Sequence, residues 1–328
     1  MSVYKRGEIW WVDISAPNGT RIRRSARTRD RKAAQEYHDR LAAELWRVYR
    51  LGEKPRRTWQ QAVLRWLSEK KGKADLKHDE EKFRWLHSHL GHLYLDEINR
   101  DLIDRIAKVK RQEVTPATAN RYLALIRAVL RCAAYEWEWT DKAPRVKLFK
   151  EPEGRVRWIT REEARTLIAE LPSHLAAMAR FALATGLRRR NVTQLRWQQI
   201  DLAGARAWVD ARDSKTGKAI PIPLNSDAQA VLMEQKGVHD EFVFVYQGHP
   251  VKQTSTKAWY AALVRAGIED FTWHDLRHTW ASWHVQAGTP LHELMELGGW
   301  KTYKTVLRYA HLAADQLSEA AKRIDMLL

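Results

Sequence analysis

The spacing of hydrophobic positions first marks out an N-terminal unit. Residues 7–14 and 20–24 have the pattern of two strands, and the turn between them contains Asn18-Gly19, a strong hairpin signal. Hydrophobic residues at helical spacing then predict a helix from about residue 31 to residue 50. The first part of the chain is therefore expected to be a β-hairpin followed by one long helix.

Helical periodicity dominates residues 58–139, after a segment at 52–57 with the composition of a linker. Within this region Thr115-Pro116 marks a helix start, because Thr caps helices well and Pro is tolerated at the first helical position. We predict a small bundle of about four helices. A second linker, rich in Pro, Gly and charged residues, is expected at about 141–156.

The remainder of the chain is predicted to be mainly helical with one β insertion. Thr160 and Glu163 have the spacing of a capping box at a helix start, and residues 206–211 and 218–224 have the pattern of a hairpin. Together the patterns predict a multidomain, mainly α fold with small β elements. Its expected parts are an N-terminal β-hairpin/helix unit, a helical bundle and a mixed α+β domain, at residues 1–56, 57–144 and 155–328.

The chain is strongly basic, and the excess is concentrated near its start. Its 57 Lys and Arg residues outnumber 40 Asp and Glu residues, which gives a formal net charge of +17 and a pI of about 10.0. Residues 1–57 alone hold 15 Lys and Arg against 7 Asp and Glu. This excess favours a polyanionic partner, because neutralised phosphates release counterions; a basic protein without such a partner is the alternative. We predict nucleic-acid binding through five arginines, Arg21, Arg23, Arg24, Arg27 and Arg29.

Cysteine content and hydropathy set further limits. Cys132 is the only cysteine, so neither an intrachain disulfide nor a cysteine metal cluster can form. The N-terminus carries charges where a signal peptide needs an apolar core. The most apolar stretch, residues 175–187, is interrupted by Arg180 and is too short to span a bilayer. We expect an intracellular protein with no membrane partner.

Five short motifs follow one another in the last region. They are ATGLRRRNVTQLRWQQID (184–201), SKTGKAIPIPL (214–224), HDLRHT (274–279), LGGW (297–300) and VLRYAH (306–311). In this order and at these intervals they resemble the tyrosine recombinases, and the phage integrases in particular. The resemblance identifies six candidate catalytic residues, with Tyr309 as the nucleophile: Arg188, Lys215, His274, Arg277, Trp300 and Tyr309.

The resemblance implies an integrase that cleaves and rejoins DNA through a 3′-phosphotyrosine intermediate, integrating or excising a phage or mobile element. The three predicted regions would be an arm-type DNA-binding domain, a core-binding domain and the catalytic domain. The implied partners are double-stranded DNA at core and arm sites, three further copies of the chain in a tetramer, and accessory DNA-bending or excision factors. No cofactor and no metal are expected, and the place of action would be DNA in the bacterial cytoplasm. The resemblance gives His274 a proton-transfer or phosphate-contact role, and Trp300 a packing role with an indole hydrogen bond to phosphate.

Physical chemistry explains why such residue types suit this reaction. Attack on a phosphodiester builds negative charge on its oxygens, and the guanidinium forks of Arg188 and Arg277 suit the non-bridging oxygens. A phenol such as Tyr309 has an ordinary pKa near ~10, so it needs positive surroundings or a proton acceptor. The 5′ oxygen leaves readily only when protonated, and Lys215 is the predicted acid.

Two features complicate the match. The position three residues after Arg188 is acidic in many relatives but is Asn191 here, which can hydrogen-bond but lacks the charge that orients a neighbouring cation. Tyr303 is a second tyrosine, six residues before Tyr309. Six residues turn a helix by roughly 600°, so the two tyrosines are expected on different faces, with Tyr303 structural.

Other interpretations remain open at this point. His274, Arg277 and His278 share a helical face, which also fits a solvated charged surface. A type IB topoisomerase would use the same covalent chemistry, and a DNA-binding regulator would have lost it. A metal-dependent nuclease is a third alternative, since His274 and His278 have ligand spacing, although no further ligand is obvious in the sequence.

Overall fold

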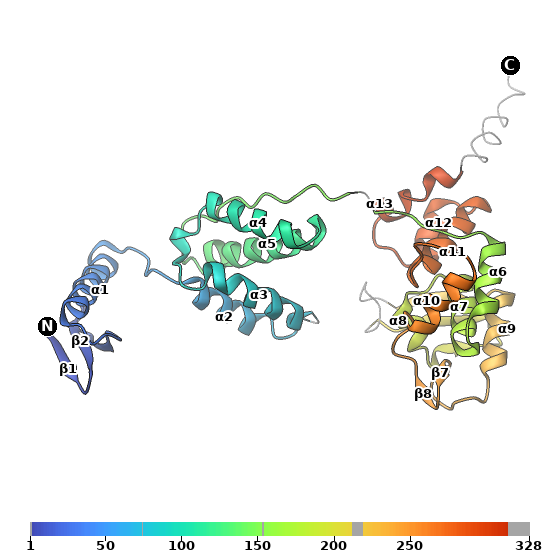
Figure 1. Ribbon diagram of the computed structural model, residues 1–328, viewed down its shortest axis with the longest axis horizontal. Coiled ribbons are helices and arrows are strands. Elements are labelled where there is room, and N and C mark those ends of the chain that lie inside the picture. The colour runs from blue at the N-terminus through green and yellow to red at the C-terminus, as the bar shows by residue number, and fades with distance from the viewer. Residues whose placement is uncertain (1, 74, 153, 212–218, 314–328) are drawn as a thin grey trace, which may run out of the picture. The chain divides into compact units, whose positions relative to one another are not determined.

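Figure 1 shows the computed structural model of the chain, which divides into two compact units, Met1–Glu153 and Gly154–Leu328. The residues that the structure describes are 2–73, 75–152, 154–211 and 219–313. Among them, no helix has the length and apolar character needed to cross a membrane.

The N-terminal part of the first unit is a three-stranded antiparallel sheet covered on one face by a helix. The strands β1 (Ser2–Arg6), β2 (Ile9–Ser15) and β3 (Arg21–Ser25) are hydrogen-bonded in that order, and α1 spans Arg31–Leu51. The predicted hairpin and helix are confirmed, whereas strand β1 was not predicted. Its sequence, SVYKR, is short and largely exposed, so the strand depends on its pairing with β2.

Alternation along the strands decides which side chains cover this sheet. Val12 and Ile14 of β2 are buried against Leu41 of α1. Residues two apart point to the same face of a strand, so Trp11 and Asp13 lie on the opposite face. That outer face also carries Arg21 and Arg23 of β3, because Ser15 pairs with Arg21 and Asp13 pairs with Arg23.

The rest of the first unit is the predicted four-helix bundle. Its helices are α2 (Trp59–Glu69), α3 (Leu76–Leu90), α4 (Arg100–Glu113) and α5 (Pro116–Arg131), followed by a π-helical turn at Cys132–Glu136. Thr115 caps α5 by accepting a hydrogen bond from the backbone N–H of Thr118, as the sequence predicted. The segment after the bundle packs against α5 at Phe149. The Asn120 side-chain amide donates a hydrogen bond to the backbone carbonyl of Phe149 and accepts one from its backbone N–H.

The second unit is mainly helical with small sheets. Its helices are α6 (Arg161–Glu170), α7 (Ser173–Thr185), α8 (Arg189–Thr193), α9 (Ser226–Gln235), α10 (Lys257–Arg265), α11 (Asp275–Gln286), α12 (Leu291–Leu297) and α13 (Tyr303–Leu307). Its strands are β4 (Ile200–Asp201), β5 (Arg206–Val209), β6 (Ile220–Pro223), β7 (Val245–Tyr246) and β8 (His249–Pro250). The predicted hairpin is confirmed as β5 and β6, and the Thr160–Glu163 capping box closes the start of α6.

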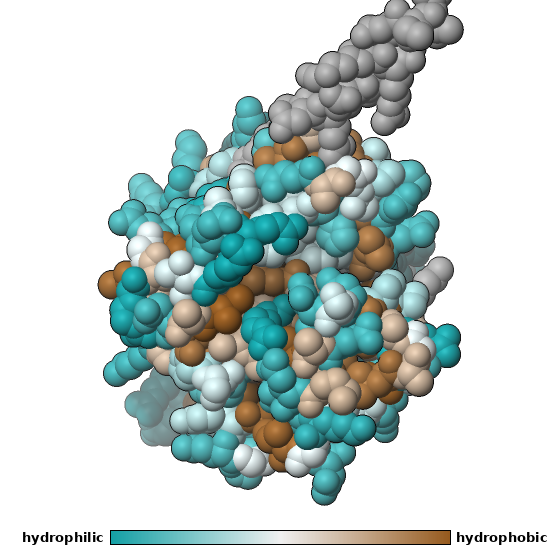
Figure 2. All heavy atoms as spheres, turned by 90° about the vertical axis from the view of Figure 1, so that its right-hand side faces the viewer, coloured by the Kyte–Doolittle hydropathy of each residue, from teal (hydrophilic) through white to brown (hydrophobic). Residues whose placement is uncertain are grey.

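Helix α7 lies at the centre of the second unit. It is apolar on nearly all sides and packs against α6, α8, α9 and α11, so residues such as Met178 and Phe181 have no exposed surface. A second apolar cluster joins α11, α12 and α13 and includes Trp280, Val306 and Tyr309. Figure 2 shows one face of this unit, on which hydrophilic residues predominate and hydrophobic residues form separate patches.

Candidate active site

The predicted catalytic motifs meet around the first turn of α11. His274 is the residue before α11 and is exposed, whereas Arg277 and His278 are only 5% and 9% exposed. The alternative of a solvated charged face is therefore wrong for Arg277 and His278. Their side of the helix is covered because α11 packs against α7 and against the α12–α13 region.

Arg277 connects two of the five motifs through backbone carbonyls. Its Nη1 donates to the carbonyl oxygen of Gly186 at 2.6 Å, and its Nη2 donates to that of Gly298 at 2.5 Å. Gly186 has a φ of 64°, and a Cβ there would collide with the ring of Trp280, so glycine is required both by conformation and by space. The guanidinium carbon also lies 4.3 Å from the centre of the Trp300 ring.

Arg188 provides a second cation close to Arg277. It precedes α8 and is half-buried, and its guanidinium has no hydrogen-bond or carboxylate partner among the residues that the structure describes. Burial lowers the pKa of Arg188. Burial and the charge of Arg188 lower the pKa of Arg277 to about 9, so both groups remain cationic at neutral pH. Two neighbouring cations with no carboxylate partner in the described part of the chain favour binding of an anion.

Tyr309 is enclosed beside these arginines. It follows α13, is 1% exposed, and its ring centre lies 6.0 Å from that of Trp300. Its hydroxyl lies 2.6 Å from Nδ1 of His278. Burial raises the pKa of Tyr309 to about 12, although Arg277 and Arg308 oppose this shift, so the phenol is neutral at neutral pH.

His274 and Trp300 complete the described part of the site. Loss of hydration and the charges of Arg277, Arg188 and Arg308 lower the pKa of His274, so its neutral form is favoured. Trp300 is half-buried, and its indole N–H donates no hydrogen bond to any described residue. The structure thus brings together five of the six predicted catalytic residues.

Lys215 lies outside the described residues. The strand that follows it, β6, contacts the α12 region, and a Cβ on Gly299 would touch the side chain of Ile220. Strand β6 is therefore packed against the LGGW segment that leads to Trp300.

The two complicating positions have clear environments. Asn191 is buried, and its Nδ2 has no hydrogen-bond partner in the described structure. Tyr303 begins α13 and is 48% exposed, whereas Tyr309 lies after the end of that helix and is buried, so the two tyrosines do not share one helix. The exposure of Tyr303 shows that it is not part of the core.

His278 is the functional candidate that the six sequence predictions left out. Its spacing from His274 pointed instead to a metal-ligand pair. Within the described residues, no group of three or more His, Cys, Asp or Glu side chains is arranged to hold a metal ion. The sequence signal that could have identified His278 as a site residue is its position directly after Arg277, on a helix with a buried face.

A separate hollow in this unit holds none of the six candidates. It has a volume of about 500 Å³, lies between α6, α7, α9 and α11, and is lined in part by Arg165, Trp283 and His284. Tyr309 instead belongs to the apolar cluster that joins α11, α12 and α13.

Comparison with known proteins agrees with this geometry. Residues 157–316 match the phage integrase family and residues 2–50 match the phage integrase N-terminal domain. The chain is 40% identical to the integrase of Salmonella phage P22, over 100% of this chain and 95% of that protein. It is 31% identical to the shufflon-specific DNA recombinase of Escherichia coli, over 65% and 56% of the two chains.

Solved structures share the fold at low sequence identity. A lambda integrase dimer bound to a COC′ core site has a TM-score of 0.64 and 19% identity, covering 94% of each chain. The Tn1549 transposon integrase in complex with a circular intermediate DNA has a TM-score of 0.67 and 15% identity, covering 80% of this chain and 99% of that one. With full-length similarity to one phage integrase and both regions matching integrase families, the chain belongs to the phage integrase family and is a tyrosine-type site-specific recombinase.

Proposed function

We propose that this recombinase cleaves and rejoins double-stranded DNA with Tyr309 as its nucleophile. The observation that carries the proposal is the pairing of Arg188 and Arg277, which have no carboxylate partner among the described residues, beside the phenol of Tyr309. A buried carboxylate would neutralise a merely structural arginine. Two guanidinium groups whose charges are not balanced by a carboxylate are instead suited to bind the oxygens of one phosphodiester group.

The proposed reaction is an in-line displacement at phosphorus. Arg188 and Arg277 hold the non-bridging oxygens and stabilise the charge that develops on them. The Tyr309 oxygen forms a bond to phosphorus, the bond from phosphorus to the 5′ oxygen breaks, and Lys215 donates a proton to that oxygen. The phosphotyrosine bond conserves the energy of the phosphodiester, so the 5′ hydroxyl of another strand can reverse the reaction without ATP.

The burial of Tyr309 adds a conformational requirement. A hydroxyl on a residue that is 1% exposed cannot reach a phosphate in a bulky duplex without movement. We infer that the segment from Tyr303 to Ala313 shifts when DNA binds, so that a phosphate can reach the phenol beside the two arginines and His278. This segment consists of α13 and a 3₁₀ turn at Ala310–Ala313, and within it only Val306 and Tyr309 are buried, which lowers the cost of such a shift.

A nicked suicide duplex carrying the element's junction sequence tests the function directly. Cleavage next to the nick releases a short 5′ fragment, so the covalent protein–DNA adduct accumulates. We expect an adduct in the presence of EDTA, because the arginines take the place of metal ions as the phosphate clamp. Peptide mapping should locate the DNA on Tyr309. Free cleaved DNA that requires added Mg²⁺ or Zn²⁺ would instead support the nuclease alternative.

Trp300 offers a sharper test of the phosphate contacts. Trp300→Phe keeps the ring beside Arg277 but loses the indole donor, so cleavage should fall by ~10–100-fold with little change in the thermal melt. Trp300→His keeps a donor and should retain more activity. Trp300→Ala should also lose stability, by less than the ~3–5 kcal/mol typical of a fully buried aromatic residue, because Trp300 is half-buried.

Single-turnover cleavage rates and thermal melts of the three Trp300 variants provide the measurement. Trp283→Phe is a matched control, because the Trp283 indole donates to the backbone carbonyl of Ile159 and not to the site. If Trp300→Phe cleaves as fast as the parent protein, Trp300 is only a packing residue.

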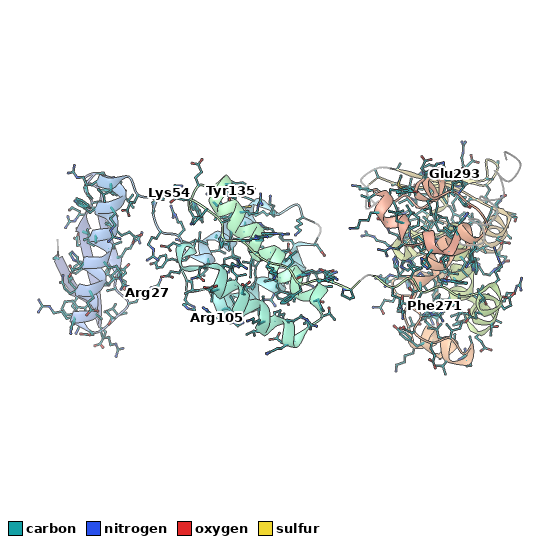
Figure 3. All side chains as sticks on the ribbon, turned by 90° about the horizontal axis from the view of Figure 1, so that it is seen from above. Arg27, Lys54, Arg105, Tyr135, Phe271 and Glu293 are labelled. Carbon is teal, nitrogen blue, oxygen red and sulfur yellow. The ribbon has the colours of Figure 1, made fainter. Side chains whose placement is uncertain are left out.

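We also propose that the N-terminal sheet binds arm-type DNA sites. All five predicted arginines are exposed, and Arg27 marks the basic loop between β3 and α1 (Figure 3). Arg21 and Arg23 project from the outer face of the sheet, and Asp13 contacts them at 2.7 and 3.0 Å. The hydrogen bond from Arg21 is the largest of the effects that lower the pKa of Asp13 to about 2, so its carboxylate stays charged and orients both guanidinium groups.

The remaining assignments follow from the same reasoning. We propose residues 1–56 as the arm-binding domain, 57–144 as the core-binding domain and 155–328 as the catalytic domain. A lambda integrase of similar fold, with a TM-score of 0.66, is described as a tetramer bound to a Holliday junction. A tetramer on paired core sites, assisted by DNA-bending or excision factors, is therefore the assembly we propose for this chain.

The double variant Arg21→Ala/Arg23→Ala tests the arm-site proposal. If each arginine contacts one phosphate, the slope of log affinity against log salt for arm-site DNA should decrease by roughly 2. Cleavage of a short core-site duplex should be unchanged. Arg47→Ala/Arg50→Ala removes the same charge from exposed positions on α1 and serves as the control. An equal loss of arm-site binding in both double variants would show that only net charge matters.

A further inference from the structure

Among the described residues, His278 is the one hydrogen-bond partner of the Tyr309 hydroxyl. Nδ1 of His278 lies 2.6 Å from the Tyr309 hydroxyl, with both side chains buried. No other described residue hydrogen-bonds to that hydroxyl. No step of the proposed displacement at phosphorus uses His278.

A proton acceptor is needed at this place. With a pKa of about 12, only about 10⁻⁵ of the Tyr309 phenol is ionised at neutral pH. A phenol attacks phosphorus poorly while it keeps its proton, so a base that takes the proton as the new bond forms removes this limit.

The environment of His278 keeps its ring unprotonated in the free protein. Burial and the charge of His274 are the main causes that lower its pKa to about 4, so the ring is neutral and a ring nitrogen has a free lone pair at neutral pH. A bound phosphodiester would neutralise the nearby cations, and the pKa of His278 should then rise toward that of a useful base. The charged and titratable groups that face this pair are His274 before α11, Asp275 and Arg277 on α11, Arg188 before α8 and Arg308 after α13.

The neighbouring groups are less suited to this role. His274 is exposed and makes no hydrogen bond to Tyr309 within the described structure. The Oδ2 atom of Asp275 already accepts hydrogen bonds from the backbone N–H and the hydroxyl of Thr272, at 2.7 and 2.8 Å. The arginines remain protonated and cannot accept a proton.

We propose that His278 is the catalytic proton acceptor for Tyr309, an inference that rests on the proposed role of Tyr309 as the nucleophile. As the Tyr309 oxygen bonds to phosphorus, its O–H bond breaks and the proton passes to Nδ1 of His278. The bond from phosphorus to the 5′ oxygen breaks, and that oxygen takes its proton from Lys215. In rejoining, the 5′ hydroxyl attacks phosphorus and gives its proton to Lys215, the bond from phosphorus to the Tyr309 oxygen breaks, and His278 returns its proton to that oxygen.

His278→Gln separates proton transfer from positioning. The Gln side chain can still accept a hydrogen bond from the phenol but cannot take its proton. We expect single-turnover cleavage of the suicide duplex to fall by ~10²–10⁴-fold at neutral pH, with unchanged DNA affinity. The variant has no base beside Tyr309, so its cleavage rate should follow the fraction of Tyr309 that has lost its proton to water. Between about pH 6 and about pH 9, the ratio of the variant's rate to the parent rate should therefore increase by up to ~10-fold per pH unit.

Two comparisons make the test specific. His284→Gln is the matched control, because His284 also lies on α11 but hydrogen-bonds to Thr289, and it should cleave at the parent rate. A duplex with a sulfur leaving group at the 5′ position should restore cleavage to Lys215→Ala but not to His278→Gln, since only the former lacks the acid. His278→Asn, with the same amide, replaces the Gln variant if thermal melting shows that Gln disturbs the fold.

The outcomes divide clearly between this inference and the proposed function. If the parent protein forms an adduct on Tyr309 and His278→Gln matches it, or is slower by one constant factor at every pH, His278 is at most a positioning residue and the inference fails. If the parent protein forms no adduct on Tyr309, the proposed function fails first.

Discussion

Tyr309→Phe is expected to bind core-site DNA with nearly unchanged affinity and to form no covalent adduct. The substitution removes only the hydroxyl that attacks phosphorus, while the ring keeps its contacts with Trp300 and with the apolar cluster that joins α11, α12 and α13. Loss of the hydroxyl leaves His278 without its partner, so a destabilisation on the order of 1 kcal/mol is expected in the thermal melt. Gel-shift titration and denaturing gels of the suicide-duplex reaction measure the two properties.

Tyr303→Phe is the control for that experiment. Tyr303 is 48% exposed and lies six residues earlier, so its hydroxyl should be dispensable for cleavage. An adduct that persists in Tyr309→Phe and disappears in Tyr303→Phe would reverse the assignment of the nucleophile.

Arg188→Ala should produce the second large effect, on rate and not on stability. Removing one preorganised donor to a developing oxyanion typically costs ~10²–10³-fold in rate. Arg188 is half-buried without a partner among the described residues, so its removal relieves a desolvated charge and should leave the thermal melt unchanged or slightly raised. Arg188→Lys should recover only part of the rate, because an ammonium group lacks the planar fork.

Two further variants test the reasoning behind this prediction. Arg189→Ala removes an exposed arginine one residue further along and should cleave normally. Arg277→Ala should lose both rate and stability, because it leaves the carbonyls of Gly186 and Gly298 without their buried donor. An Arg188→Ala protein that cleaves at the parent rate would remove Arg188 from the proposed phosphate clamp.

Local sequence patterns were sufficient for most of the secondary structure. The β2–β3 hairpin, helix α1 and the capping box before α6 depend on residues within a few positions of one another, so their signals are visible in the sequence. Strand β1 was missed because its five residues show no strong alternation of buried and exposed positions. Its extended form is stabilised by pairing with β2, which residue patterns within the strand do not reveal.

The sequence by itself determined the family resemblance and the types of residue at the site, because catalytic chemistry demands particular side chains at recognisable spacings. Only the tertiary structure decided how these residues are held. Arg277 reaches Gly186, 91 positions away, and His278 reaches Tyr309, 31 positions away. Such contacts arise when α7, α11 and the segment after α13 pack together, and that packing also buries the phenol and raises its pKa. Sequence spacing placed His274 and His278 on one helical face, but only the fold showed that His278 is the one in contact with Tyr309.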